Sequence, residues 1–308
     1  MKKIFLYLVC IPFISCSQQE TVEKDFVPST INSTIDSISP FYDMAYYSKF
    51  HNNWYNLQDG LQYIEMSGPR KLDIGDSKIS LLKIDPNAFT FEMLSASQFD
   101  STKRCAVDWA NEFDLNVVIN AGMYDLRRQL SSKGMLRNSK DYANNSKLYE
   151  GYNMMIAFNP VDGAKVSSFD IFDLKCTDVN TIKKQYHSLA QGMRMIDCEG
   201  NAMSWNKNPQ WCSQLIVAKD KKGQIYFVFT RSPYSHNEMI QFMINLDEPL
   251  TNAIYMEGGP QTSLFITTEK DRIEKLGSYV SRTYPTDKNG EFWELPNIIG
   301  LKSIKKPL

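Results

Sequence analysis

The sequence lacks the features that mark several large classes of protein. Only three of its 308 residues are His, so a His-rich metal site is not expected. Lys and Arg number 34 against 35 Asp and Glu, so the formal net charge is -1 and there is no cationic excess to neutralise nucleic-acid phosphates. Beyond the extreme N-terminus, no apolar run approaches the roughly 20 residues that a membrane-spanning helix needs. We therefore expect a globular chain that has no nucleic-acid partner.

The first 16 residues have the composition of an export signal. Two lysines precede an apolar run over residues 4–14, which is too short to span a bilayer. A small residue followed by Cys16 resembles a lipobox, in which the cysteine thiol is acylated. We expect a lipoprotein signal over residues 1–16 and a cell-envelope protein anchored to the membrane at Cys16. An ordinary cleaved signal with an incidental cysteine is the alternative.

Residues 17–40 are rich in Ser, Thr, Asn and Asp and are expected to form a flexible tether, which leaves one large domain over residues 41–308. Four cysteines in that domain allow three disulfide pairings, which an exported protein would permit. Free buried thiols are the alternative, and a zinc site is disfavoured because no C-x-x-C pair occurs. The four are Cys105, Cys176, Cys198 and Cys212.

Strand-like and helix-like patterns share the large domain. Residues 78–84 and 89–94 flank a turn sequence and are predicted to pair as a hairpin. Apolar residues at helical spacing predict an amphipathic helix around residues 106–113. Ser235 and Glu238 have the spacing of a capping box before a second helix. We therefore predict an α+β fold, with a mixed or largely antiparallel sheet and packed helices.

Two apolar strands end in corners that contain glycine. The first corner reads VVINAGMY over residues 117–124, and the second reads IYMEGGP over residues 254–260. Strand ends expose side chains and backbone amides on a rigid base, so both corners are candidate parts of a site. Each also has a purely structural interpretation, in which the glycines bend the chain and Asn120 caps a turn.

The two corners, in this order, resemble those of the phosphodiester glycosidase family, the uncovering-enzyme type of domain. That family carries an INGG(Y/F)F-like strand end, then a central segment in which a Gly is usually followed by Pro, then an LDGGxS-like strand end. The resemblance covers the chain from about residue 72 to its C-terminus. Two departures stand out: Glu257 replaces the usual Asp, and Gln261 replaces the usual Ser. The positions that match are Asn120, Gly122, Tyr124, Gly134, Gly192, Glu257, Gly258 and Gly259.

The resemblance implies a hydrolase that releases a sugar from a phosphodiester, as the animal member does with N-acetylglucosamine on mannose-type glycans. We expect Glu257 to be the catalytic carboxylate, because such a reaction needs a group that activates water or stabilises an oxocarbenium-like centre. Arg194 is the expected phosphate partner, because its planar fork matches phosphate oxygens, with a surface salt bridge as the alternative.

Other residues are assigned to substrate binding. Asn120, also counted with the catalytic group, and Gln191 are expected to orient sugar hydroxyls, and Tyr124 to stack or to form a hydrogen bond. Arg231 and His236 follow a strong strand and could reach the site, although the favoured interpretation of His236 is the first turn of a helix. The glycines expected at the site are Gly122, Gly192, Gly258 and Gly259.

No cofactor is required by the sequence. Asp125 offers a second carboxylate, or a ligand if the site holds a divalent cation. The expected function is an exported glycan-processing hydrolase that acts on sugar phosphodiesters or related glycosides. The alternative is a non-catalytic surface lipoprotein that binds glycan or peptidoglycan through the same cleft.

Overall fold

The structure is a computed structural model that describes residues 48–125, 127–205 and 210–304. The expected signal over residues 1–16, the lipidation site Cys16 and the tether over residues 17–40 lie outside the described residues. These three features therefore stay predictions of the sequence.

Strands dominate the described residues, with 46% in strands and 11% in helices. The predicted α+β fold with packed helices was therefore wrong: antiparallel sheets make up the body, and the described α-helices are three short ones. The largest sheet has 11 strands, in the order β1-β2-β3-β14-β13-β15-β12-β10-β11, with β8 paired to β12 and β9 paired to β8. These strands are β1 (Tyr55–Gln58), β2 (Leu61–Ser67), β3 (Lys78–Ile84), β8 (Leu136–Arg137), β9 (Ala143–Asn145), β10 (Met154–Pro160), β11 (Phe169–Asp173), β12 (Tyr186–Ile196), β13 (Trp211–Lys219), β14 (Ile225–Ser235) and β15 (Thr251–Gly258).

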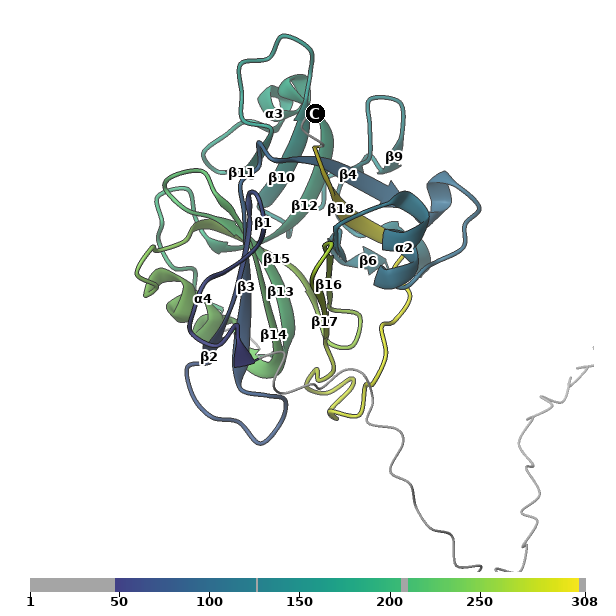
Figure 1. The fold of residues 1–308 in the computed structure, drawn as a ribbon. Helices are drawn as coiled ribbons and strands as arrows, with labels where there is room; N and C mark the ends of the chain where they lie inside the picture. Colours follow the sequence, from purple (N-terminus) through teal and green to yellow (C-terminus); the bar gives the residue numbers. More distant parts are fainter. Residues whose placement is uncertain (1–47, 126, 206–209, 305–308) are drawn as a thin grey trace, which may run out of the picture. The chain divides into compact units, whose positions relative to one another are not determined.

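A second sheet has five strands in the order β17-β16-β5-β18-β4, and a two-stranded ribbon joins β6 to β7. The main hydrophobic cluster contains residues of both larger sheets, such as Ile119 and Leu264 from one and Leu215 and Phe227 from the other. The two sheets therefore share one core (Figure 1). The strands are β4 (Phe89–Ser95), β5 (Val117–Asn120), β6 (Tyr124–Asp125), β7 (Arg128–Ser132), β16 (Ser263–Thr267), β17 (Arg272–Leu276) and β18 (Asn297–Ser303).

The helices cover the outer faces of the sheets (Figure 1). On the five-stranded sheet, α2 (Ala106–Phe113) buries Trp109 against Val118 and Phe265. On the larger sheet, α4 (His236–Ile244) buries Met239 and Met243. Both match predicted helices, and the capping box of α4 is confirmed, with Ser235 and Glu238 exchanging side-chain to backbone hydrogen bonds. The remaining helical pieces are α3 (Val179–Gln185) and the 3₁₀ turn η1 (Ala96–Gln98).

The predicted hairpin of residues 78–84 with 89–94 does not form. Strand β3 pairs with β2 and β14, whereas β4 pairs with β18 in the other sheet. The turn between them carries the chain from one sheet to the other. A local turn sequence allows both outcomes, and long-range burial decides between them.

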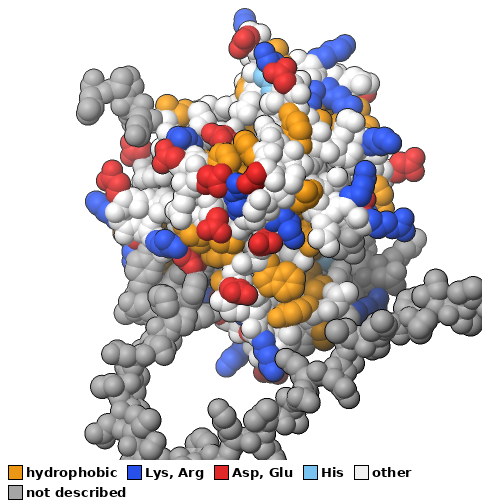
Figure 2. Space-filling model, turned by 90° about the vertical axis from the view of Figure 1, so that its right-hand side faces the viewer, with side chains coloured by type: hydrophobic (Ala, Val, Ile, Leu, Met, Phe, Trp, Pro, Cys, Tyr) orange, Lys and Arg blue, Asp and Glu red, His pale blue; other side chains and the backbone are white. Residues whose placement is uncertain are grey.

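Of the cysteines in the described residues, Cys176 and Cys198 form a disulfide, which ties the end of β11 to the end of β12. Cys105 and Cys212 are free, and Cys212 is buried. In the part of the chain that the structure describes, no helix is long and apolar enough to cross a membrane. On the face that carries α2 and β6, acidic and basic side chains are interspersed with hydrophobic ones, in keeping with the near-zero net charge (Figure 2).

Candidate active site

The two glycine-containing corners meet although they belong to different sheets. Strand β5 ends at Asn120, whose side chain reaches the second corner. Its Nδ2 donates to the carbonyl of Gln261 at 2.9 Å, and its Oδ1 accepts from the backbone N–H of Ser263 at 2.8 Å. Asn120 is buried, so these bonds are shielded from water. The role that the structure gives Asn120 is to hold the two corners together.

Glycine is required at these corners by backbone conformation and by space. Gly122 and Gly259 have φ values of +87° and +82°, in the left-handed region that side chains disfavour. At Gly258, an added Cβ would lie 2.1 Å from the Tyr255 hydroxyl oxygen and 3.0 Å from Cys212 Sγ. The backbone beside Glu257 is therefore packed directly against buried side chains.

A pocket of about 770 Å³ opens at the junction of the two corners. It contains the predicted site residues Glu257, Tyr124 and Asp125, and also Gln261, the second position that departs from the family pattern. Its other lining residues are Met123, Arg127, Arg128, Lys133, Asn145, Lys147, Leu148 and Tyr149.

Glu257 is the buried acid at this pocket, and its surroundings favour the protonated form. Its side chain is buried, with 8% of the residue exposed, and its Oε1 accepts a hydrogen bond from the N–H of Gly258 at 3.0 Å. Among the described residues, no Lys or Arg forms an ion pair with it. Burial raises the pKa of Glu257 to about 7, although the Gly258 bond acts in the opposite direction. A group with this pKa can both accept and donate a proton near neutral pH.

The other titratable groups close to Glu257 remain protonated. Burial raises the pKa of Tyr124, and the charge of Glu257 raises it further. Burial and Glu257 also raise the pKa of Tyr152 and Tyr255, and burial raises that of Cys212 to about 12. Glu257 is therefore the group in this cluster that titrates near neutral pH.

Tyr124 and Gln261 form a pair at the pocket. The Gln261 Nε2 donates to the Tyr124 hydroxyl oxygen at 2.8 Å. Because this oxygen accepts the bond and the phenol stays protonated, the phenolic hydrogen remains available for donation to another group. Gln261 can therefore orient Tyr124 as a hydrogen-bond donor.

Gln191 positions a wall of the pocket. Its Oε1 accepts from the N–H groups of Met135 and Tyr149, at 3.0 and 2.9 Å. Its Nε2 donates to the carbonyls of Tyr149 and Tyr152, at 3.0 and 2.7 Å. These four bonds use the amide's hydrogen-bonding capacity, so Gln191 orders the loop that carries Tyr149 rather than offering its side chain to a sugar. The neighbouring Gly192 allows β12 to approach β15 closely, because an added Cβ would lie 2.9 Å from the Tyr255 carbonyl oxygen.

The pocket is also lined by four cationic side chains that the sequence analysis did not assign to the site. Arg128 pairs with Asp125 at 3.2 Å, while Arg127, Lys133 and Lys147 have exposed side chains. None of the four lies in a recognisable motif. The sequence offered one indication of a role for Lys133: it directly precedes Gly134, which matches a glycine of the family pattern.

The two arginines predicted for the site lie outside the lining of this pocket. Arg194 forms an ion pair with the buried Asp173, near the disulfide end of β12. Arg231 fixes a following segment through an ion pair with Asp287 at 2.9 Å and a hydrogen bond from its Nη2 to the carbonyl of Asn289 at 2.8 Å. We do not assign either guanidinium to the substrate.

His236 is also committed to packing. Its ring stacks on Trp205, with centroids 4.1 Å apart, and meets the edge of Tyr255 at 4.7 Å. Burial lowers the pKa of His236 to about 4, so the ring is neutral at physiological pH. The structure thus favours the interpretation of His236 as the first residue of α4.

Among the described residues, no cluster of ligands for a divalent cation, which the sequence allowed at Asp125, lies at the pocket. In the described ranges, one group of three His, Cys, Asp or Glu side chains is close enough to hold a metal: Asp173, Cys176 and Cys198. The two cysteines of this group are joined in the disulfide. Asp125 does not belong to the group, and its place as a metal ligand stays a prediction.

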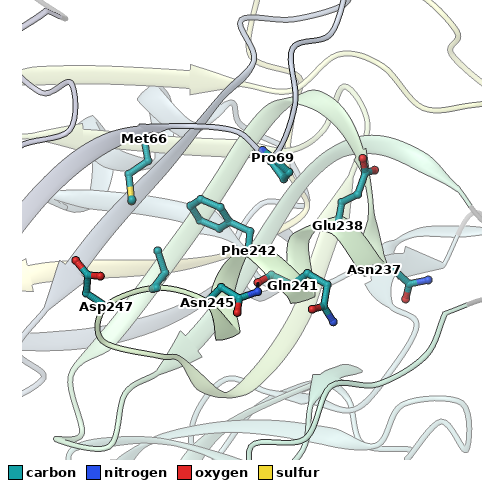
Figure 3. A pocket seen from close by; sticks show the side chains of 9 residues that line it. Met66, Pro69, Asn237, Glu238, Gln241, Phe242, Asn245 and Asp247 are labelled. Atoms are coloured by element: carbon teal, nitrogen blue, oxygen red, sulfur yellow. Dashed lines mark hydrogen bonds between the residues drawn. The ribbon is translucent and has the colours of Figure 1, made fainter.

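A second hollow of about 500 Å³ lies over the outer face of α4. Met66, Pro69 and Phe242 give it an apolar lining, and Asn237, Glu238, Gln241, Asn245 and Asp247 add polar side chains (Figure 3). Glu238 is already engaged by the cap of α4 and by an ion pair with Arg70 at 2.6 Å. This hollow offers no catalytic group comparable with Glu257.

A pocket beside a buried acid that titrates near neutral pH is a candidate functional site. A family model for phosphodiester glycosidases matches residues 113–302, which include both corners and the pocket. The chain belongs to the phosphodiester glycosidase family, as its motifs indicated.

A solved structure supports the fold. The catalytic domain of zebrafish N-acetylglucosamine-1-phosphodiester alpha-N-acetylglucosaminidase, auto-inhibited by its pro-peptide, is similar with a TM-score of 0.54 and 12% identity, over 81% of this chain and 86% of that one. A hypothetical protein from Synechocystis is similar with a TM-score of 0.48 and 12% identity, over 81% of this chain and 63% of that one. No curated protein matches.

Proposed function

We propose that the protein is a hydrolase that cleaves a sugar 1-phosphodiester, of the N-acetylglucosamine type, or a related glycoside. The observation that carries the proposal is Glu257, a buried acid with a pKa of about 7 at the pocket where the two family corners meet. The cations that line the same pocket suit an anionic substrate.

The reaction needs little acid catalysis from the protein, because a phosphate is already a good leaving group. In our proposal the ionised form of Glu257 activates water or stabilises the oxocarbenium-like centre. Tyr124, held by Gln261, donates its phenolic hydrogen bond to the substrate. The low dielectric around Glu257 strengthens both interactions.

The test is release of sugar from a synthetic N-acetylglucosamine 1-phosphodiester. We expect turnover by the wild-type protein and a loss of about 1,000-fold in kcat in Glu257→Gln, which lies within the range that a positioned general acid or base contributes. Glu294→Gln is the matched control, because that side chain is 63% exposed and pairs only with Lys103 among described groups. Turnover that survives Glu257→Gln would show that another group is the catalytic carboxylate.

The competing function is non-catalytic glycan or peptidoglycan binding. Leu148 and Tyr149 are 45% and 40% exposed beside the cations, a surface that could hold a glycan without cleaving it. Micromolar glycan binding without turnover across several sugars would establish this function and overturn the hydrolase.

We also propose that the protein is exported and anchored to the cell envelope by a lipid at Cys16. The support is the sequence of residues 1–16 alone. Metabolic labelling with a fatty acid should mark the wild-type protein and not Cys16→Ser; equal labelling of both would contradict the anchor.

A further inference from the structure

The pocket holds more positive charge than a single phosphodiester needs. Four cations line it, together with Asp125 and with Glu257, which is about half protonated at neutral pH. The scissile phosphodiester brings one negative charge. One or two of the cations are therefore left without a counter-charge in the proposed complex, and crowded like charges are unfavourable.

Three of these cations have no acidic partner among the residues that the structure describes. Arg128 pairs with Asp125, but among the described residues Arg127, Lys133 and Lys147 form no ion pair. All three side chains are exposed. Exposed cations that line one pocket and lack partners are available to an anionic ligand.

The loops that carry the two lysines are held in place. Asn145 donates from its Nδ2 to the carbonyls of Ser132 and Gly134, each at 3.0 Å. The Nζ of Lys133 lies 4.9 Å from the ring centroid of Tyr149, a cation–π contact, and the Tyr149 backbone is bound by Gln191. The cations therefore stand on an ordered wall, next to an exposed aromatic ring.

We propose that Arg127, Lys133 and Lys147 form a second anion subsite, which takes a further phosphate on the leaving-group side of the substrate. This rests on the proposed function. The sugar that is released is neutral, so a second negative charge must lie beyond the scissile phosphate. The substrate class is then a glycan phosphodiester whose aglycone carries another phosphate, either a terminal monoester or the next diester of a chain.

Three synthetic substrates test the subsite: N-acetylglucosamine 1-phosphate esterified to glycerol, to glycerol 3-phosphate, or to glycerol 3-(methyl phosphate). We expect kcat/KM to be about tenfold higher for substrates with two phosphates at low salt, and the preference to vanish at about 0.5 M salt, where exposed charges are screened. Preference for both two-phosphate substrates indicates a chain of diesters, and preference for glycerol 3-phosphate alone indicates a terminal monoester.

The double variant Lys133→Gln/Lys147→Gln should reduce that preference to below about twofold, since each exposed charge contributes a factor of a few. Lys184→Gln is the matched control, because Lys184 is exposed on α3 and does not line the pocket. Its preference should equal that of the wild type.

The outcomes separate the two proposals. Turnover of the glycerol substrate with no preference for a second phosphate overturns the subsite and leaves the hydrolase standing. If no substrate is turned over, the hydrolase fails, and calorimetric titration with the same three compounds decides the subsite. Tighter binding of the two-phosphate compounds, lost in the double variant, supports it, and equal binding overturns it.

Discussion

Two buried glutamates in this protein have opposite electrostatic surroundings. Glu65 on β2 is fully buried, and it forms ion pairs with Lys78, at 3.0 Å, and with Lys275 on β17. Burial alone would raise the pKa of Glu65, but the charges and hydrogen bonds of Lys275 and Lys78 outweigh it and the pKa is lowered. Glu257 is almost as buried, but it forms no ion pair with any described residue, and its pKa rises.

The difference shows that burial by itself does not define a functional acid. The Glu65 carboxylate is held ionised and joins the larger sheet to β17 of the other sheet, which is a structural role. The Glu257 carboxylate is left with one backbone hydrogen bond beside a pocket. An unpaired buried acid costs stability, and such a cost is typical of active sites.

Removing Glu65 should have the largest effect on stability. Glu65→Gln removes the carboxylate that pairs with Lys78 and Lys275, and we expect a loss of about 3 to 5 kcal/mol in the free energy of unfolding. Urea unfolding at pH 7 measures it. A loss below about 1 kcal/mol would mean that the lysines reach water or other partners easily and that the two glutamates differ less than their pKa values indicate.

Removing the charge of Glu257 should raise the stability of the protein rather than lower it. Its folded pKa of about 7 lies above the unfolded value of 4.5, so its contribution to stability is complete below pH 4.5 and is lost as the pH rises through 7. We expect Glu257→Gln to be about 2 to 3 kcal/mol more stable than the wild type at pH 8.5 and similar to it at pH 4. Unfolding of both proteins at the two pH values checks this, and a pH-independent difference would contradict the raised pKa.

The backbone beside Glu257 should tolerate no added methyl group. Gly258→Ala brings a Cβ against the buried Tyr255 hydroxyl, and we expect a loss of about 1 to 3 kcal/mol from overpacking. Gly290→Ala is the matched control, because nothing lies within 4 Å of its added Cβ. Thermal unfolding of the two variants compares them, and equal melting temperatures would show that the corner can relax.

The smallest effect should come from Tyr124 and Gln261, the hydrogen-bonded pair that lines the pocket with Glu257. Tyr124→Phe removes the phenolic hydroxyl, and Gln261→Ser removes the side chain that orients it. We expect kcat/KM to fall about tenfold in either variant, or about 1.4 kcal/mol. Because the two side chains act as a unit, the double variant should lose little more than each single one. Losses that multiply would show that Gln261 acts on the substrate independently of Tyr124.

The sequence predicted the elements whose signals are local. The helix at residues 106–113, the cap at Ser235 and the strand ends at Asn120 and Glu257 all follow from patterns within about ten residues. The fold class was wrong because two conspicuous helical patterns outweighed many short strands, and strands of two or three residues, such as β6 and β9, show no alternation at all.

The surroundings of the other residues depend on partners that are distant in the sequence. Arg194 was expected at the phosphate, but its charge is matched by Asp173 on β11, which only the strand order brings near. Likewise, Glu65 and Lys275 are 210 residues apart. Lys147 and Tyr149 sit in a loop with no motif, so their place at the pocket depends on Gln191, a residue that the motif pointed to for a different reason.

The Cys176–Cys198 bridge determines how the protein should be produced. It closes a separation of 22 residues between the ends of β11 and β12, beside the Asp173–Arg194 ion pair. Cytosolic reductants remove bonds of this kind, and losing a loop closure of this size costs about 3 kcal/mol. Material made in a reducing cytosol would therefore differ from material made in an oxidising compartment, and a negative activity assay has meaning only after the thiol content of the sample has been measured.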